Sequence, residues 1–186
     1  MFSNYQRLIE KVDRHLRTLP ACACPGGCSV CCRAGLSLFP VEAFYLRRAF
    51  RQLPAGLREL ATEGLPDGDG DACPLLLDGR CLLYEQRPML CRTHGHPFIL
   101  RPDGGPEPGS RVLHPGCEVL GQVAGNEPPG EAGSFLDMDR LNRMLVAVNE
   151  LFLACLPSRS AGVPFRVRME RIVAANDRGG FLDAHL

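Results

Sequence analysis

The chain has 186 residues, 45% of them hydrophobic, so it is long enough to bury an ordinary core without relying on a metal. Its 21 basic and 21 acidic side chains cancel. That balance disfavours a nucleic-acid binder or a protein of anionic membrane surfaces, because both usually carry a basic excess.

The distribution of apolar residues along the sequence argues against export and against insertion into a membrane. Residues 1–20 carry acidic and basic side chains and lack a continuous apolar core, which argues against a secretory signal. The most apolar stretch, 141–156, is interrupted by polar and charged residues and is too short for a membrane span. We therefore expect a cytoplasmic protein with no membrane partner.

Apolar residues at helical spacing predict a first helix over 3–19, which Pro20 would stop. A second helix is expected over 40–53, with Pro40 in its first turn, and a shorter third helix over 55–63.

The middle of the chain is rich in turns. Asp78-Gly79 stands between two apolar runs and predicts a small hairpin, and Pro88 should open a short helical turn. Glycine and proline recur through 101–133, and only 112–121 within it is rich in apolar residues. We therefore expect a covering loop or a mobile segment.

The longest helix is predicted over 134–156, with Ser134 and Asp137 as its capping signal and an apolar stripe along one face. A final helix is expected near 164–175.

Ten cysteines without an export signal point to metal binding or catalysis, since structural disulfides are rare in a reducing compartment. Eight of them fall into two sets. The first set is Cys24, Cys28, Cys31 and Cys32, around two glycines that let the backbone turn tightly. The second set is Cys73, Cys81, Cys91 and Cys117, each bordered by turn residues.

Thiolates suit both zinc and iron–sulfur clusters. Eight thiols match two tetrahedral sites, one cluster plus one zinc, or a single cluster with thiols left over, and the spacing does not choose among these. The adjacent Cys31-Cys32 pair and the large number of thiols favour an iron–sulfur cluster, with zinc as the alternative.

Other candidate ligands have simpler interpretations. Cys155 lies in an apolar helical stretch and is expected to be a buried core residue. Cys22 is a possible ligand that competes with Cys24 for the first position. For His94, His96 and His114 a surface role is favoured over metal ligation, and His94 or His96 is the better candidate because both follow Cys91.

The ordered motifs CPGGCSVCCR (24–33), PVEAFYL (40–46) and CPLLLDGRCLLYEQRPMLCR (73–92), followed by Cys117, resemble the YkgJ-like cysteine-cluster family. Its domain is described as a zinc- or iron-chelating domain of the CxxCxxCC type. The resemblance covers residues 24 to about 120 and implies a metal site formed by the matched cysteines. This chain has three residues, not two, between Cys24 and Cys28, which leaves the first ligand position open between Cys24 and Cys22.

Two arginines flank the second cysteine set. Arg87 and Arg92 would stabilise a negatively charged thiolate cluster or bind an anionic substrate, and an ordinary ion pair with Glu85 is the competing interpretation. Tyr84 is expected in the core.

The cysteine spacing also occurs in radical-SAM enzymes, but the chain lacks the length and the strand–helix repeats of their barrel. We expect a cysteine-cluster metal-binding protein, with its site structural or electron-handling. The alternatives are an oxidoreductase or methyl-transfer enzyme component, or a metal-trafficking or sensing module with a protein partner. Whether it is an enzyme is left open.

The predicted architecture is a mainly α single domain over 1–186 with at most a small β-hairpin. A metal-pinned cysteine segment, 21–120, would lie across the helices, and helices within 134–176 would pack on the N-terminal helix.

Overall fold

A computed structural model describes residues 1–19, 28–33, 35–63, 72–100, 112–114, 135–156, 164–174 and 182. The backbone forms two compact units that alternate along the chain. The first unit comprises Met1–Phe2, Gly27–Arg92 and Val148–Leu186, and the second comprises Ser3–Gly26 and Thr93–Ala147. The single-domain boundary 1–186 stays a prediction.

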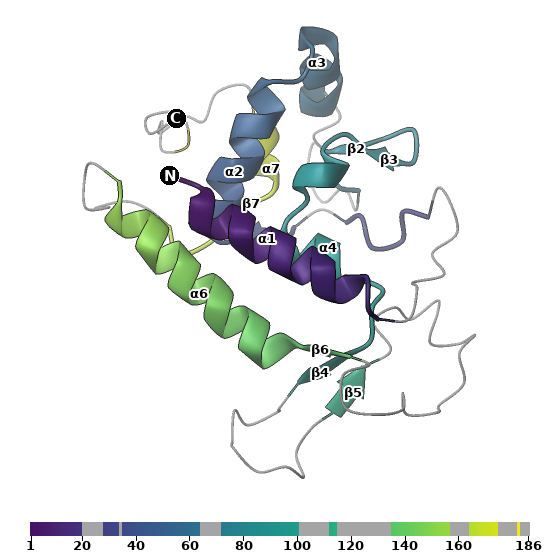
Figure 1. The fold of residues 1–186 in the computed structure, drawn as a ribbon. Coiled ribbons are helices and arrows are strands. Elements are labelled where there is room, and N and C mark those ends of the chain that lie inside the picture. The colour runs from purple at the N-terminus through teal and green to yellow at the C-terminus, as the bar shows by residue number, and fades with distance from the viewer. Residues whose placement is uncertain are drawn as a thin grey trace. The chain divides into compact units, whose positions relative to one another are not determined.

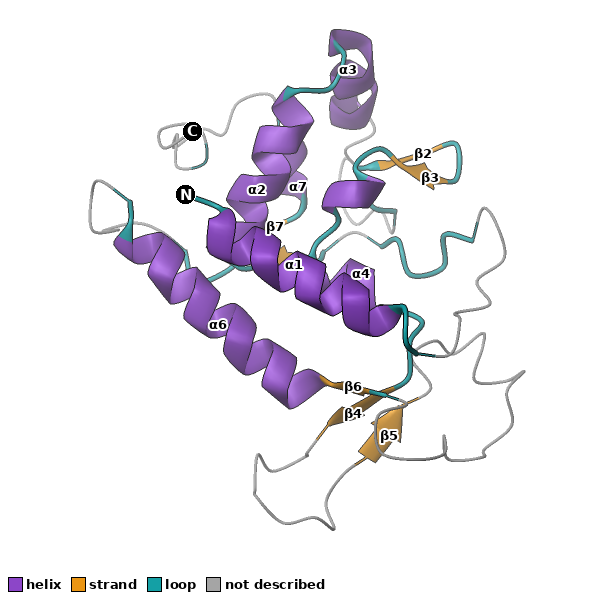
Figure 2. Cartoon of the chain, in the orientation of Figure 1, coloured by secondary structure: helices purple, strands orange, loops and turns teal. Residues whose placement is uncertain are grey.

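The described part of the chain is mainly helical, as the sequence predicts (Figure 2). The helices are α1 (Ser3–Leu16), α2 (Pro40–Arg51), α3 (Ala55–Glu63), α4 (Met89–Thr93), α6 (Met138–Ala154) and α7 (Glu170–Val173), with a 3₁₀ turn, η1 (Tyr84–Gln86). None of these described helices is long and apolar enough to cross a membrane.

The described strands are short but form three small sheets (Figure 1), so the prediction of at most a small β-hairpin is wrong. The strands are β1 (Ser37–Leu38), β2 (Leu76–Leu77), β3 (Arg80–Cys81), β4 (Phe98–Leu100), β5 (Val112–His114), β6 (Leu136–Asp137) and β7 (Val167–Arg168). β1 pairs with β7 and β2 with β3, both antiparallel, whereas β4 lies between antiparallel β5 and parallel β6.

Helix α2 is the centre of the core of the first unit. Its residues Val41, Ala43, Phe44 and Leu46 are at most 1% exposed. Phe44 meets the ring of Phe152, on the last part of α6, with centroids 5.3 Å apart. Helix α2 also contacts α7, whose apolar residues are fully buried. Burial of these side chains supplies the main free energy that holds this unit together.

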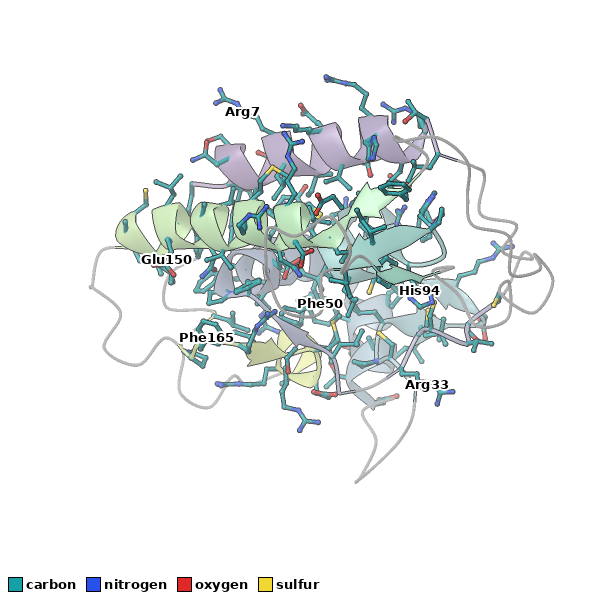
Figure 3. The ribbon with its side chains drawn as sticks, turned by 90° about the horizontal axis from the view of Figure 1, so that it is seen from below. Arg7, Arg33, Phe50, His94, Glu150 and Phe165 are labelled. Atoms are coloured by element: carbon teal, nitrogen blue, oxygen red, sulfur yellow. The ribbon has the colours of Figure 1, made fainter. Side chains whose placement is uncertain are left out.

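In the second unit, α1 lies beside residues 138–147 of α6 (Figures 1 and 3). The predicted face of α1 is buried through Tyr5, Leu8, Val12 and Leu16. His15 adds a hydrogen-bonding contact of 3.4 Å between its Nε2 and the carbonyl oxygen of Phe135. Helix α1 ends at Leu16, three residues before the predicted boundary, and a turn carries the chain to Leu19.

Two C-terminal boundaries differ from the prediction. The long helix begins at Met138, not 134, because Asp137 caps it: its Oδ1 accepts the Arg140 N–H at 2.9 Å. The helix expected over 164–175 is wrong in most of its length. Val167–Arg168 instead forms β7 against β1, and only Glu170–Val173 is helical. Pairing with a distant strand outweighs the local helical pattern there.

A buried carboxylate fixes the start of α2. Glu42 is 4% exposed, and its two oxygens accept main-chain N–H groups from Phe39 at 3.1 Å and from Met89 at 2.9 Å. The buried Asn149 adds a third bond, accepting the Val41 N–H at 3.1 Å. Since Met89 opens helix α4, Glu42 ties α2 directly to the turn that carries Cys91.

Replacing Glu42 with alanine should therefore destabilise the protein by about 3 kcal/mol, because it strands two buried N–H groups. Glu42→Gln should cost less, since its amide oxygen can still accept one of the two bonds. Urea unfolding at neutral pH measures both, with Glu10→Ala on the exposed face of α1 as the control. Equal midpoints for Glu42→Ala and Glu10→Ala would show that the buried bonds contribute nothing.

Candidate metal centre

The two cysteine sets meet through main-chain hydrogen bonds. Cys32 sits in a turn in which its N–H donates to the Ser29 carbonyl at 2.9 Å. The Cys32 carbonyl in turn accepts the N–H of Cys73 at 2.9 Å, and an isolated bridge pairs Arg33 with Ala72. The first set is thus joined directly to the start of the second, although about 40 residues separate them.

The predicted hairpin brings the next cysteine to the same place. Asp78 and Gly79 adopt positive φ angles of 49° and 72°, which is the conformation that a two-residue hairpin turn requires. Cys81 lies opposite Leu76 in the ladder, and the Leu82 N–H donates to the Leu75 carbonyl at 2.9 Å. The chain therefore returns to the level of Cys73 as it reaches Cys81.

Main-chain N–H groups point at two of the sulfur atoms. The N–H of Leu75 donates to the sulfur of Cys73, and that of Leu83 donates to the sulfur of Cys81. Both donors stand two residues after the cysteine. Such bonds favour the thiolate, which is the form that binds metal.

Cys91 is held from two sides. Met89, at the start of its helix, is anchored by Glu42, and the guanidinium of Arg92 donates to the main-chain carbonyl of Glu85 at 2.5 Å. Burial and the negative charges of nearby thiols raise the pKa of the Cys91 thiol to about 12. The thiols that act on it are those of Cys73, Cys81, Cys32 and Cys31.

Six cysteines thus form one group through their mutual electrostatic effects. Burial first, and then its thiol neighbours, raise the pKa of Cys32, and the Cys31 thiol shares a hydrogen bond with it. The charge of Cys28 acts on both. We call this the six-cysteine group; its members are Cys28, Cys31, Cys32, Cys73, Cys81 and Cys91.

All members of the six-cysteine group are half-buried free thiols. Figure 3 shows several sulfur atoms on the side of the molecule that carries the labelled Arg33. The group is looser than a coordination sphere: within the described ranges, no three Cys, His, Asp or Glu side chains are arranged to hold a metal ion. The donor chemistry fits a soft metal, whereas the sulfur positions would have to draw together to bind one.

Several predicted candidates are not part of the six-cysteine group as defined from the described residues. Cys22, Cys24 and Cys117 lie outside the described residues, as does the side chain of His114. His94 is exposed and His96 half-buried, and both belong to the second unit, so ligation by either stays a prediction. The burial predicted for Cys155 is wrong. It lies just beyond the end of α6 and is exposed, whereas Leu141, Leu145 and Phe152 of that helix are buried.

Tyr84 and Arg87 lie beside the second cysteine set. Tyr84 was expected in the core but is 58% exposed, so that expectation is wrong. The guanidinium of Arg87 stacks on its ring at 3.9 Å. Arg87 also lowers the pKa of Cys81, against the larger effect of burial, which raises it. Stabilisation of a thiolate cluster and binding of an anionic substrate both stay predictions for Arg87.

The raised thiol pKa values predict a pH dependence for the metal-free protein. Burial raises the pKa of Cys73 to about 11 and that of Cys91 to about 12, above the usual thiol pKa of 9.0, so the stability that they contribute is present below about pH 9. It is lost as the pH rises through the folded values, because the unfolded chain ionises first. The urea midpoint of reduced, metal-free protein should therefore fall between pH 8 and pH 10.5, and fall less in Cys91→Ser. A midpoint equally pH-dependent in both proteins would contradict this.

Some residues that shape the group are not evident from ligand spacing. Glu42 could have been found from its position two residues after Pro40, where an acidic side chain accepts N–H groups of the first helical turn. The Leu75 and Leu83 N–H groups carry no signal in the sequence beyond their position two residues after a cysteine.

Comparison with protein-family models, curated proteins and solved structures finds no match to this chain. The resemblance to the YkgJ-like family therefore stays a prediction that depends on the motifs alone.

Proposed function

We propose that the chain is a metal-binding protein whose six-cysteine group, with Cys24 and Cys117, holds an iron–sulfur cluster or, alternatively, zinc. The observation that supports this most is that six cysteines from three separate segments lie close enough for their charges to raise the pKa of neighbouring thiols in the group. None of the described cysteines forms a disulfide. Repulsion among thiolates is costly unless a cation compensates it.

Although burial raises the thiol pKa values, some contacts of the sulfur atoms would stabilise thiolates once a metal is bound. The sulfurs of Cys73 and Cys81 accept main-chain N–H groups, and Arg87 adds a positive charge near Cys81. These contacts offset negative charge without supplying a competing ligand. A bound cluster would supply a one-electron redox centre, and zinc would supply a structural cross-link.

Binding would have to contract the group, because no described trio is positioned for an ion. The contraction requires the loss of protons from buried thiols with raised pKa values, those of Cys73 and Cys91 above all. Metal affinity should consequently rise with pH and the protein should release protons as it loads. We favour an iron–sulfur cluster because the group is larger than one zinc requires.

Protein purified without oxygen tests the proposal directly. Iron and acid-labile sulfide in equal amounts, together with visible charge-transfer absorption, would establish the cluster. Colourless protein with stoichiometric zinc would establish the alternative. Metal far below one equivalent, after reconstitution with iron and sulfide or with zinc, would refute both.

A further inference from the structure

A second candidate site lies in the first unit and contains no cysteine. Residues of helices α2, α3 and α7 line an open cleft of about 600 Å³, a volume within the range of small-molecule sites. Its lining includes the buried side chains of Arg47, Phe50 and Val173, with Phe50 labelled in Figure 3. Glu59 and Glu63 are exposed and stand at its rim.

The walls of the cleft are fixed by hydrogen bonds. The Arg47 guanidinium donates from Nη1 to the carbonyls of Ile172 at 2.7 Å and Ala174 at 3.0 Å, which locks α2 to α7. The Thr62 hydroxyl contacts the Val173 carbonyl at 3.0 Å and so locks α3 to the same segment. A cleft held in this way is formed before a ligand arrives, which lowers the cost of binding.

Arg58 carries the feature that points to a ligand. Its Nε is fully buried, and no described group accepts a hydrogen bond from it. A buried guanidinium N–H without an acceptor is unfavourable. An oxygen atom in the cleft would remove that cost if the Arg58 side chain turned its Nε toward the cleft. Three arginines line the cleft against two glutamates, so the lining has a positive balance.

We propose that this cleft binds a small organic oxyanion, a carboxylate or phosphate, with Arg58 as its principal donor. The planar guanidinium matches the paired oxygens of both groups. The buried ring of Phe50 provides an apolar surface for the body of the ligand. The carboxylates of Glu59 and Glu63 oppose the ligand charge from the rim and keep the affinity moderate. This site is independent of the metal centre.

Titration calorimetry with phenyl phosphate and with inorganic phosphate, at low ionic strength, tests the proposal. Phenyl phosphate should bind saturably and more tightly than inorganic phosphate, because it adds contact with Phe50. Arg58→Ala should weaken binding by about tenfold or more, the usual effect of losing a charged hydrogen bond. Glu59→Gln should strengthen it by about threefold. Arg7→Ala, on the exposed face of α1, should leave the affinity unchanged.

Arg58→Gln serves in place of Arg58→Ala if the alanine variant is unfolded by circular dichroism. Binding should also persist in Cys32→Ser, which would separate this site from the metal centre. Affinity equal to wild type in folded Arg58 variants, or no saturable binding by the wild type at millimolar concentration, would overturn the proposal.

Discussion

Cys32→Ser should abolish tight metal binding. Cys32 acts electrostatically on Cys31, Cys73 and Cys91, and its carbonyl accepts the hydrogen bond that joins the two cysteine sets. Serine leaves that main-chain bond intact and removes only the sulfur. Loss of a residue that only supports a metal ligand lowers metal affinity by at most roughly 100-fold. Loss of the Cys32 sulfur, which would be a ligand itself, should lower the affinity by more than that. Metal content after desalting, and competition with a chromogenic chelator, measure the effect.

Cys155→Ser is the matched control, because it makes the same chemical change at an exposed thiol beyond helix α6. Its metal content should equal that of the wild type. Cys32→Ser should also match metal-free wild type in its urea midpoint, which would separate loss of a ligand from loss of the fold. Equal metal in the two variants would remove Cys32 from the proposed centre.

Removing the metal should lower the melting temperature by roughly 10 °C. A ligand present at about 1,000 times its dissociation constant stabilises a protein by about 4 kcal/mol. For a chain of this size each kcal/mol shifts the midpoint by about 2–4 °C. The effect should be large here because the described cysteines lie in segments that are connected through hydrogen-bonded turns, and a bound metal would cross-link those segments. Differential scanning calorimetry before and after treatment with a strong chelator measures the shift.

Returning the metal should restore the original melting temperature, and chelator should not shift the melting of Cys32→Ser. A wild type whose melting is unchanged by removal of bound metal would show that the metal does not cross-link these segments.

Much of the first unit could be predicted because strong local signals set its boundaries. Pro40 fixes the first turn of α2, and Asp78-Gly79 has the backbone angles that only a few residue types adopt readily. The β4–β6 sheet and β7 could not be predicted in the same way. Strands of two or three residues carry no periodicity of their own, and their distant partners define them.

The ligand set of the candidate centre stays a prediction. The spacing of the cysteines predicts eight ligands, and six of those cysteines make up the six-cysteine group. The fixing of Cys91 through Glu42 depends on a contact between residues 47 positions apart, which the sequence alone does not reveal. Likewise Tyr84 has the composition of a core residue, but the position of η1 leaves it exposed beneath Arg87.

X-ray absorption at the edge of the bound metal tests the central claim most directly, because it reports which atoms touch the ion. We expect a first shell of sulfur at about 2.3 Å, with a further iron shell if the centre is a cluster. Loss of that shell in Cys32→Ser but not in Cys155→Ser would assign the sulfur to the six-cysteine group. A first shell of only nitrogen and oxygen at about 2.0–2.2 Å would contradict the account.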